Sequence, residues 1–211
     1  MHADQVGTAI DGVLRIVTGC LRPTPLDNLP ILAGIQPAKL RRETATLSLA
    51  RRALEPTHLL HQTFTNNKQH RRLKSRHSFV PAARLLLEQA DTLGTSAAHW
   101  ADHHWNAEWK KNPTRLRTFI TDAESLPTGV SLPRMAWVQL NRLRTGVGRF
   151  CSLMHKWGVA PSPACDCCTD DQTAEHVITD CPIYRAPSGA QGLRDLDEHS
   201  IQWLLNKCPD I

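Results

Sequence analysis

The fold of the C-terminal part of this chain is decided by two short runs, Ala164-Cys165-Asp166-Cys167-Cys168-Thr169 and His176-Val177-Ile178-Thr179-Asp180-Cys181-Pro182. They place four of the seven cysteines and one histidine within 17 residues. Cys165, Cys167, His176 and Cys181 have the spacing C-x-C-x8-H-x4-C, and Cys168 in place of Cys167 gives C-x2-C-x7-H-x4-C. Either set offers three thiolates and one imidazole, which is a closed tetrahedral donor set. A catalytic zinc keeps one position open for water, so the pattern predicts a structural zinc.

The residues between the ligands favour this convergence. Two cysteines one or two residues apart face one ion only across a tight turn, and Asp166 favours a turn because its side chain accepts from nearby backbone N–H groups. The polar interval 169–175 is expected to be a loop that leads into a short helical turn presenting His176. Pro182 stops that turn. The alternative is a run of cysteines without metal, and the spare thiol of Cys168 or Cys167 could exchange as a ligand or be oxidised.

Composition excludes some classes of protein. The chain has 211 residues, of which 41% are hydrophobic, with a formal charge of +5 and a pI near 9.0. This length fits one large domain or two small ones. The sequence contains no run of 18 apolar residues, so no membrane span is expected. Its first residues show no pattern of a secretory signal. Cysteines clustered with histidine favour a reduced, intracellular environment over a disulfide framework.

Positive charge is concentrated in one region. Residues 37–76 contain ten Lys or Arg side chains against two acidic ones, whereas residues 165–181 contain five acidic side chains and no Lys or Arg. Clustered Lys and Arg attract phosphate groups, so a nucleic-acid partner would contact the basic region first. An equally good interpretation is a solvated helix face. The candidate contacts are Arg41, Arg42, Arg51, Arg52, Lys68, Arg71, Arg72, Lys74 and Arg76.

Apolar spacing predicts a mainly α chain with no sizeable sheet. We expect helices near residues 9–20, 25–34, 38–54, 81–93, 97–111, 113–123, 134–146, 150–157 and 193–206. Residues 126–133 are rich in Pro, Gly and Ser and are a candidate boundary. Four segments are therefore expected: a helical segment 1–64, a basic linker 65–78, a helical segment 79–125, and a C-terminal helical region 126–211 with a zinc knuckle at 165–181.

A second metal site near the middle of the chain is disfavoured. His99 and His103 lie one helical turn apart, next to Asp102 and His104. No third ligand accompanies them with a recognisable spacing, so packing among the neighbouring tryptophans is the better interpretation.

Two further stretches extend the pattern to most of the chain. One stretch is the run Leu14-Arg15-Ile16-Val17-Thr18-Gly19-Cys20-Leu21-Arg22-Pro23-Thr24-Pro25-Leu26, which is continued by residues 29–37 and Leu40-Arg41-Arg42. It resembles the stretch just beyond the polymerase palm in LINE-type (non-LTR) retrotransposon reverse transcriptases. Arg142-Leu143-Arg144-Thr145-Gly146 and the Cys165/Cys167/His176/Cys181 knuckle resemble the C-terminal end of the same polyprotein.

The resemblance implies a role in target-primed reverse transcription, in which element RNA is copied into DNA at a nicked genomic site. The segment 1–64 would be thumb-like and grip the template–primer helix, and the later segment would be the C-terminal, RNA-binding region, which contains the zinc knuckle. The implied partners are RNA, DNA as a further candidate, and the remainder of the polyprotein, with no membrane and no small-molecule substrate. The implied location is a cytoplasmic ribonucleoprotein or the nucleus.

Catalytic residues of that family are not visible in the sequence. Its polymerases hold two Mg²⁺ at a paired-Asp turn after an apolar strand, whereas the sole Asp-Asp pair here, Asp170-Asp171, lies inside the knuckle. No endonuclease constellation is visible either. We therefore expect a non-catalytic, nucleic-acid-binding C-terminal fragment of an RNA-directed DNA polymerase polyprotein. The alternatives are a helical protein-interaction module with a structural zinc, and a decayed element fragment without independent function.

Overall fold

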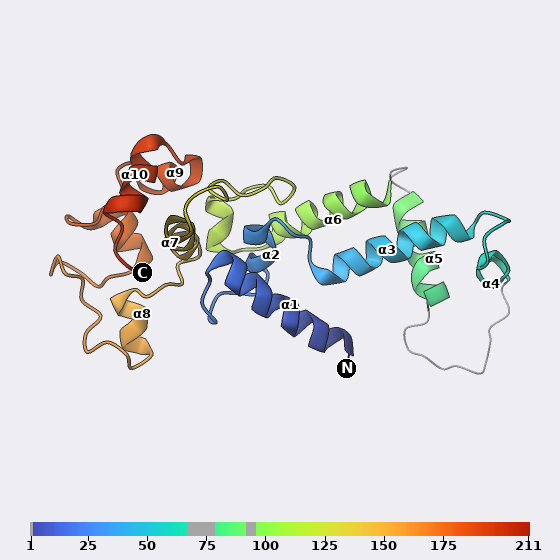
Figure 1. Ribbon diagram of the computed structural model, residues 1–211, viewed down its shortest axis with the longest axis horizontal. Coiled ribbons are helices and arrows are strands. Elements are labelled where there is room, and N and C mark those ends of the chain that lie inside the picture. The colour runs from blue at the N-terminus through green and yellow to red at the C-terminus, as the bar shows by residue number, and fades with distance from the viewer. Residues whose placement is uncertain (1, 67–78, 92–95) are drawn as a thin grey trace. The chain divides into compact units, whose positions relative to one another are not determined.

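The computed structural model describes residues 2–66, 79–91 and 96–211, and the chain is mainly helical (Figure 1). Among these residues no strand is present, and one isolated antiparallel bridge joins Ala164 to Asp171. The expectation of a mainly α chain without a sizeable sheet is confirmed. The helices group into two compact units, which we call the first unit (Met1–Ile35 and Trp109–Ile211) and the second unit (Gln36–Glu108). The four segments expected from the sequence stay a prediction.

The helices follow the apolar periodicity closely in several places. The predicted helix 97–111 is found with those bounds, whereas the predicted helix 113–123 is reduced to a single 3₁₀ turn. The elements are α1 (His2–Thr18), α2 (Asn28–Ala33), α3 (Ala38–Ala53), α4 (His61–Thr65), α5 (Phe79–Asp91), α6 (Ala97–Lys111), η1 (Arg115–Thr118), α7 (Arg134–Thr145), α8 (Cys151–Lys156), η2 (His176–Asp180), α9 (Gly189–Asp195) and α10 (Glu198–Asn206).

The second unit is built on α3, which packs against α4 and α5. Helix α3 begins after Pro37, whose φ of −52° and ψ of 144° are extended, as expected for a residue flanking a helix start. Its buried face ends in two alanines, Ala50 and Ala53, which form a small core with Phe64 and Ala83. The small side chains allow α3 and α5 to approach closely, and the opposite face of α3 is left to polar residues.

In the first unit, α7 contacts the C-terminal end of α1. The last carbonyls of a helix have no partner within the helix. Here they accept hydrogen bonds from one side of α7: Arg134 Nη atoms to Ile16 and Val17, Trp137 Nε1 to Val17 at 3.3 Å, Asn141 Nδ2 to Thr18 at 2.9 Å, and Arg142 Nε to Gly19 at 3.1 Å. Two of these donors are guanidinium groups, whose positive charge also favours the negative end of a helix dipole.

Gly19 allows α1 and α7 to approach this closely. Its φ is +72°, a left-handed conformation that ends α1 and that side chains disfavour. A Cβ at this position would lie 2.3 Å from Cγ2 of Val138 on α7. Any other residue at position 19 would therefore push the two helices apart.

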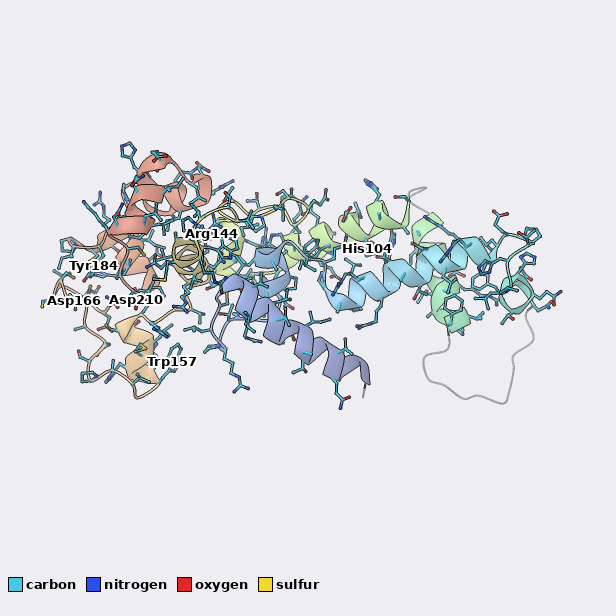
Figure 2. All side chains as sticks on the ribbon, in the orientation of Figure 1. His104, Arg144, Trp157, Asp166, Tyr184 and Asp210 are labelled. Atoms are coloured by element: carbon cyan, nitrogen blue, oxygen red, sulfur yellow. The ribbon has the colours of Figure 1, made fainter. Side chains whose placement is uncertain are left out.

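A buried arginine joins α7 to the segments on its other side. Arg144 is completely buried, and its guanidinium donates to the Thr128 carbonyl at 2.9 Å, the Thr128 hydroxyl at 2.6 Å and the Leu193 carbonyl at 2.7 Å (Figure 2). Burial lowers the pKa of Arg144 to about 10. Its charge is stabilised by oxygen dipoles, including a carbonyl in the last turn of α9.

The C-terminal helix expected over residues 193–206 is two helices. Helix α9 ends at Asp195, and the next residue, Leu196, has a left-handed φ of +52°. Asp197 then caps α10, because its carboxylate accepts from the Ser200 N–H at 2.7 Å. Position 196 is a leucine and not a glycine or proline, so apolar spacing alone predicts one continuous helix through the break.

Candidate metal centre

The loop before η2 forms the turn that the sequence requires. The Cys165 N–H donates to the Asp170 carbonyl at 2.9 Å, and the Cys168 N–H donates to the Cys165 carbonyl at 2.9 Å. Cys168 has a φ of +59°, in the left-handed region. Its thiol is exposed and lies 3.6 Å from the Asp166 carbonyl oxygen. The turn therefore directs Cys167, and not Cys168, toward Cys165.

The unusual spacing of His176 and Cys181 is explained by η2. This element is one π-helical turn, in which the Cys181 N–H donates to the His176 carbonyl at 2.8 Å, five residues earlier. The wider turn brings residues five apart to one side. At the start of η2, the His176 N–H donates to the Thr173 hydroxyl at 3.1 Å, which satisfies a terminal amide group.

Four ligand atoms converge in the folded chain. The Sγ atoms of Cys165, Cys167 and Cys181 and a ring nitrogen of His176 all lie within 4.8 Å of one another. The two buried sulfurs, of Cys165 and Cys181, are 3.7 Å apart, and Cys167 Sγ is 3.1 Å from His176 Nε2. We call these four residues the Cys3His cluster; it could hold a metal ion.

The thiols of the cluster have unlike environments. Burial raises the pKa of Cys165 to about 12. A hydrogen bond with the Thr169 hydroxyl, at 3.0 Å from Cys167 Sγ, lowers the pKa of Cys167 to about 6. A bound cation deprotonates a coordinating thiol outright. The pKa of Cys165 is the higher of the two, so metal binding would lower it the most. Three sulfurs and one imidazole suit a borderline-soft ion better than Mg²⁺ or Ca²⁺.

Tyr184 supports the cluster from outside and was missed by the sequence reasoning. Its N–H donates to Cys181 Sγ at 3.3 Å, and its hydroxyl donates to the Asp166 carboxylate at 2.7 Å (Figure 2). The Asp166 bond raises the pKa of Tyr184 to about 12. The Tyr184 carbonyl accepts from Trp203 Nε1 at 3.0 Å, which ties the cluster to α10. The only signal was that the chain has a single tyrosine, three residues after Cys181.

The histidines of α6 are not brought into a metal site. Asp102 accepts a hydrogen bond from Gln36 Nε2 at 2.6 Å, and the His104 ring stacks on Trp100 with centroids 4.4 Å apart. Within the described ranges, the Cys3His cluster is the sole group of three or more His, Cys, Asp or Glu side chains whose ligand atoms converge.

The basic candidates fall into two sets. Arg41, Arg42 and Arg52 are exposed on α3, and Arg51 is half-buried. Arg41 and Arg52 are eleven residues apart and therefore point in nearly the same direction, about 16 Å apart along the axis. The other predicted contacts lie outside the described residues: Lys68, Arg71, Arg72, Lys74 and Arg76.

Comparisons with known proteins identify no relative. No family model, no curated protein and no solved structure matches this chain. In the part of the chain that the structure describes, no helix has both the length and the apolar character needed to cross a membrane.

Proposed function

We propose first that the Cys3His cluster is a structural zinc site. The observation that supports zinc is the separation of the two buried sulfurs. Tetrahedral Zn²⁺ with Zn–S bonds of about 2.3 Å places two sulfurs about 3.8 Å apart, and those of Cys165 and Cys181 are 3.7 Å apart. All four positions are taken by protein atoms, so no site is left for a reacting water.

Zinc content of the purified chain tests this assignment. One zinc per chain is expected, and Cys165→Ser should lose it together with the folded structure around η2. Cys168→Ser is the matched control, because it removes an adjacent thiol that points away from the cluster. Loss of zinc from Cys168→Ser, or its retention in Cys165→Ser, would contradict the ligand assignment.

We propose further that the chain is a non-catalytic, nucleic-acid-binding segment of the kind found at the C-terminal end of LINE-type retrotransposon reverse transcriptases. The proposal rests on the resemblance and on the convergence of the four ligands at its C-terminal signature. The attraction for phosphate groups would come from α3. Its exposed face carries Arg41 and Arg52, and Ala50 and Ala53 on its buried face belong to the core of the second unit.

The α3 contribution is tested by removing its charge. The double variant Arg41→Gln/Arg52→Gln should weaken binding to single-stranded RNA. If each arginine neutralises one phosphate, the slope of log K against log salt falls by about 1.4. Lys110→Gln/Lys111→Gln, at the exposed end of α6, is the control with the same change in charge. Equal effects of the two double variants would show that only net charge matters and would refute a site on α3.

Absence of polymerase activity is part of the proposal. Primer extension on an RNA template with Mg²⁺ is expected to give no product from this chain. A template-dependent product that is lost when the protein is omitted would overturn this part, whatever the outcome for RNA binding.

One observation favours a second candidate, a helical protein-interaction module. On helix α1, Val13 is 58% exposed and Ile16 is 73% exposed. Apolar side chains that are exposed together on one helix are typical of a protein-binding surface. If this face binds another protein, Val13→Gln/Ile16→Gln should abolish that binding and reduce concentration-dependent association, with RNA affinity unchanged. Loss of RNA affinity in the same variant would argue against a separate protein-binding face.

A further inference from the structure

A cavity of about 350 Å³ lies within the first unit, between the stretch that follows η1 and the last turn of α9. Its size is at the lower end of the range for ligand pockets, so it suits one long side chain better than a large ligand. The charged and apolar lining residues that solvent reaches are the half-buried Asp122 and the exposed Leu126, Arg194 and Asp195. Leu126 is 65% exposed, so its side chain is available to a ligand.

Arg144 fixes the two walls of this cavity to each other. Its guanidinium donates to the Thr128 carbonyl at 2.9 Å in one wall, and to the Leu193 carbonyl at 2.7 Å next to the other wall. The Thr128 hydroxyl in turn donates to the Arg194 carbonyl at 3.0 Å, which joins the walls directly. The cavity is therefore preformed, because its shape depends on a buried group that a ligand does not touch.

The segments around the cavity have the opposite charge to the chain as a whole. Residues 119–133 contain two acidic side chains and no Lys or Arg, and residues 194–198 contain three acidic side chains and one arginine. Five acidic side chains and one basic side chain give these segments a formal charge of −4, in a chain whose formal charge is +5. Such a surface repels phosphate groups and attracts a cationic ligand.

The two carboxylates of the lining are held in place by their own segments. Asp122 Oδ1 accepts from the Glu124 N–H at 2.9 Å, and Asp195 Oδ2 accepts from Gln191 Nε2 at 2.5 Å. An ionised carboxylate accepts about four hydrogen bonds, so each of them has acceptor positions left for a ligand. The cavity thus offers oriented acceptors from two walls, with one apolar side chain beside them.

We propose that this cavity binds a single arginine side chain of an extended peptide in a partner protein. An arginine joins an apolar stem to a charged head, so the stem would lie against Leu126 while the head binds Asp122 and Asp195. Its planar group of five donors matches carboxylates better than an ammonium does. Arg194 would donate to a peptide carbonyl and would repel a second cation, which favours one arginine over a run of basic residues. The inference is independent of the proposed nucleic-acid function.

The test compares two labelled heptapeptides of alanine and glycine that carry arginine or citrulline at the centre. Citrulline has nearly the shape of arginine and no charge. Binding to the full chain is followed by fluorescence anisotropy, and we expect the arginine peptide to bind about tenfold more tightly at low salt. Oligouridine should not displace the arginine peptide, because its phosphates are repelled from the cavity. Displacement by oligouridine would place the peptide on an RNA-binding surface and overturn the proposal.

Two double variants separate the cavity from general charge. Asp122→Asn/Asp195→Asn should reduce the preference for arginine over citrulline to about twofold or less, since the amides carry no charge. Each asparagine keeps an oxygen that can accept the bond from the Glu124 N–H or from Gln191, so the walls should be retained. Glu55→Gln/Glu108→Gln is the control with the same change in charge, at exposed positions of the second unit. No preference for arginine in the unaltered chain, or equal behaviour of the two double variants, would overturn the arginine site.

Discussion

Replacing Arg144 by methionine tests whether a buried charge holds the first unit together. The substitution keeps an unbranched side chain of similar length and removes the guanidinium. Four hydrogen bonds to Thr128 and Leu193 are lost, three of 2.6–2.9 Å and a longer one of 3.3 Å from Nε to the Leu193 carbonyl. A bond from a charged donor contributes about 1.5–3 kcal/mol, so the three short bonds account for a gross loss of roughly 4.5–9 kcal/mol. Burial lowers the pKa of Arg144 to about 10. Methionine carries no charge and so avoids the cost of burying one. At about 1.4 kcal/mol per pKa unit, this returns roughly 3 kcal/mol of the lost stability.

The expected net effect of Arg144→Met is a loss of about 3 kcal/mol in the free energy of unfolding. For a unit of this size, that lowers Tm by roughly 10 °C. Urea unfolding followed by tryptophan fluorescence measures the change. Arg149→Met is the matched control, because Arg149 is exposed, and it should change stability by about 0.5 kcal/mol or less.

Arg144→Lys separates charge from geometry. A lysine keeps the positive charge but cannot reach both Thr128 and Leu193 with one planar group. It should recover only part of the loss. Unchanged or increased stability of Arg144→Met would refute the reasoning, since it would mean that the desolvation cost of the buried guanidinium equals or exceeds the value of its bonds.

Three further changes test the contacts of the first unit and are measured by thermal unfolding. Gly19→Ala should cost about 2–3 kcal/mol, because its φ is +72° and a Cβ would meet Val138 at 2.3 Å. Asn141→Asp removes the donor to the Thr18 carbonyl and places negative charge at the negative end of α1. It should cost about 3 kcal/mol at neutral pH and be partly rescued by acid, because a protonated carboxyl can donate. Asp197 caps α10 and its pKa is lowered, first by the hydrogen bond from the backbone N–H it caps. Its stabilisation is therefore present above the unfolded pKa and lost as pH falls through the lower folded pKa, and Asp197→Asn should flatten that part of the stability–pH curve.

Structural features that depend on residues close together in the sequence could be predicted from it. The bounds of α6 and the end of α7 at Gly146 follow from apolar spacing and helix-ending residues, both of which act within a turn or two. The break at Leu196 could not be predicted, because a left-handed leucine has no compositional signal. The 3₁₀ turn of η1 is another such case: tertiary packing overrides a weak helical preference.

The four residues of the Cys3His cluster were predicted from the sequence with one ambiguity. Spacing alone allowed Cys167 or Cys168, because both lie within reach of a turn after Cys165. The left-handed conformation of Cys168 selects Cys167, and that conformation depends on how the loop closes onto Asp170. The contribution of Tyr184 was invisible for a similar reason: its two bonds join residues that are close only after η2 and α10 have folded.

The fold also changes how the basic composition should be interpreted. A formal charge of +5 suggests a surface available to phosphate groups. In the first unit, however, Arg134, Arg142 and Arg144 donate to backbone carbonyls at helix ends, where each performs a structural task. The guanidinium of Arg144 is completely buried, so a phosphate could reach it only by breaking the contacts between α7 and α9. Arg41 and Arg52 lie on the exposed face of α3, away from its core. We therefore expect charge-driven binding to depend on α3, so that the salt dependence of RNA affinity should respond to substitution of Arg41 and Arg52.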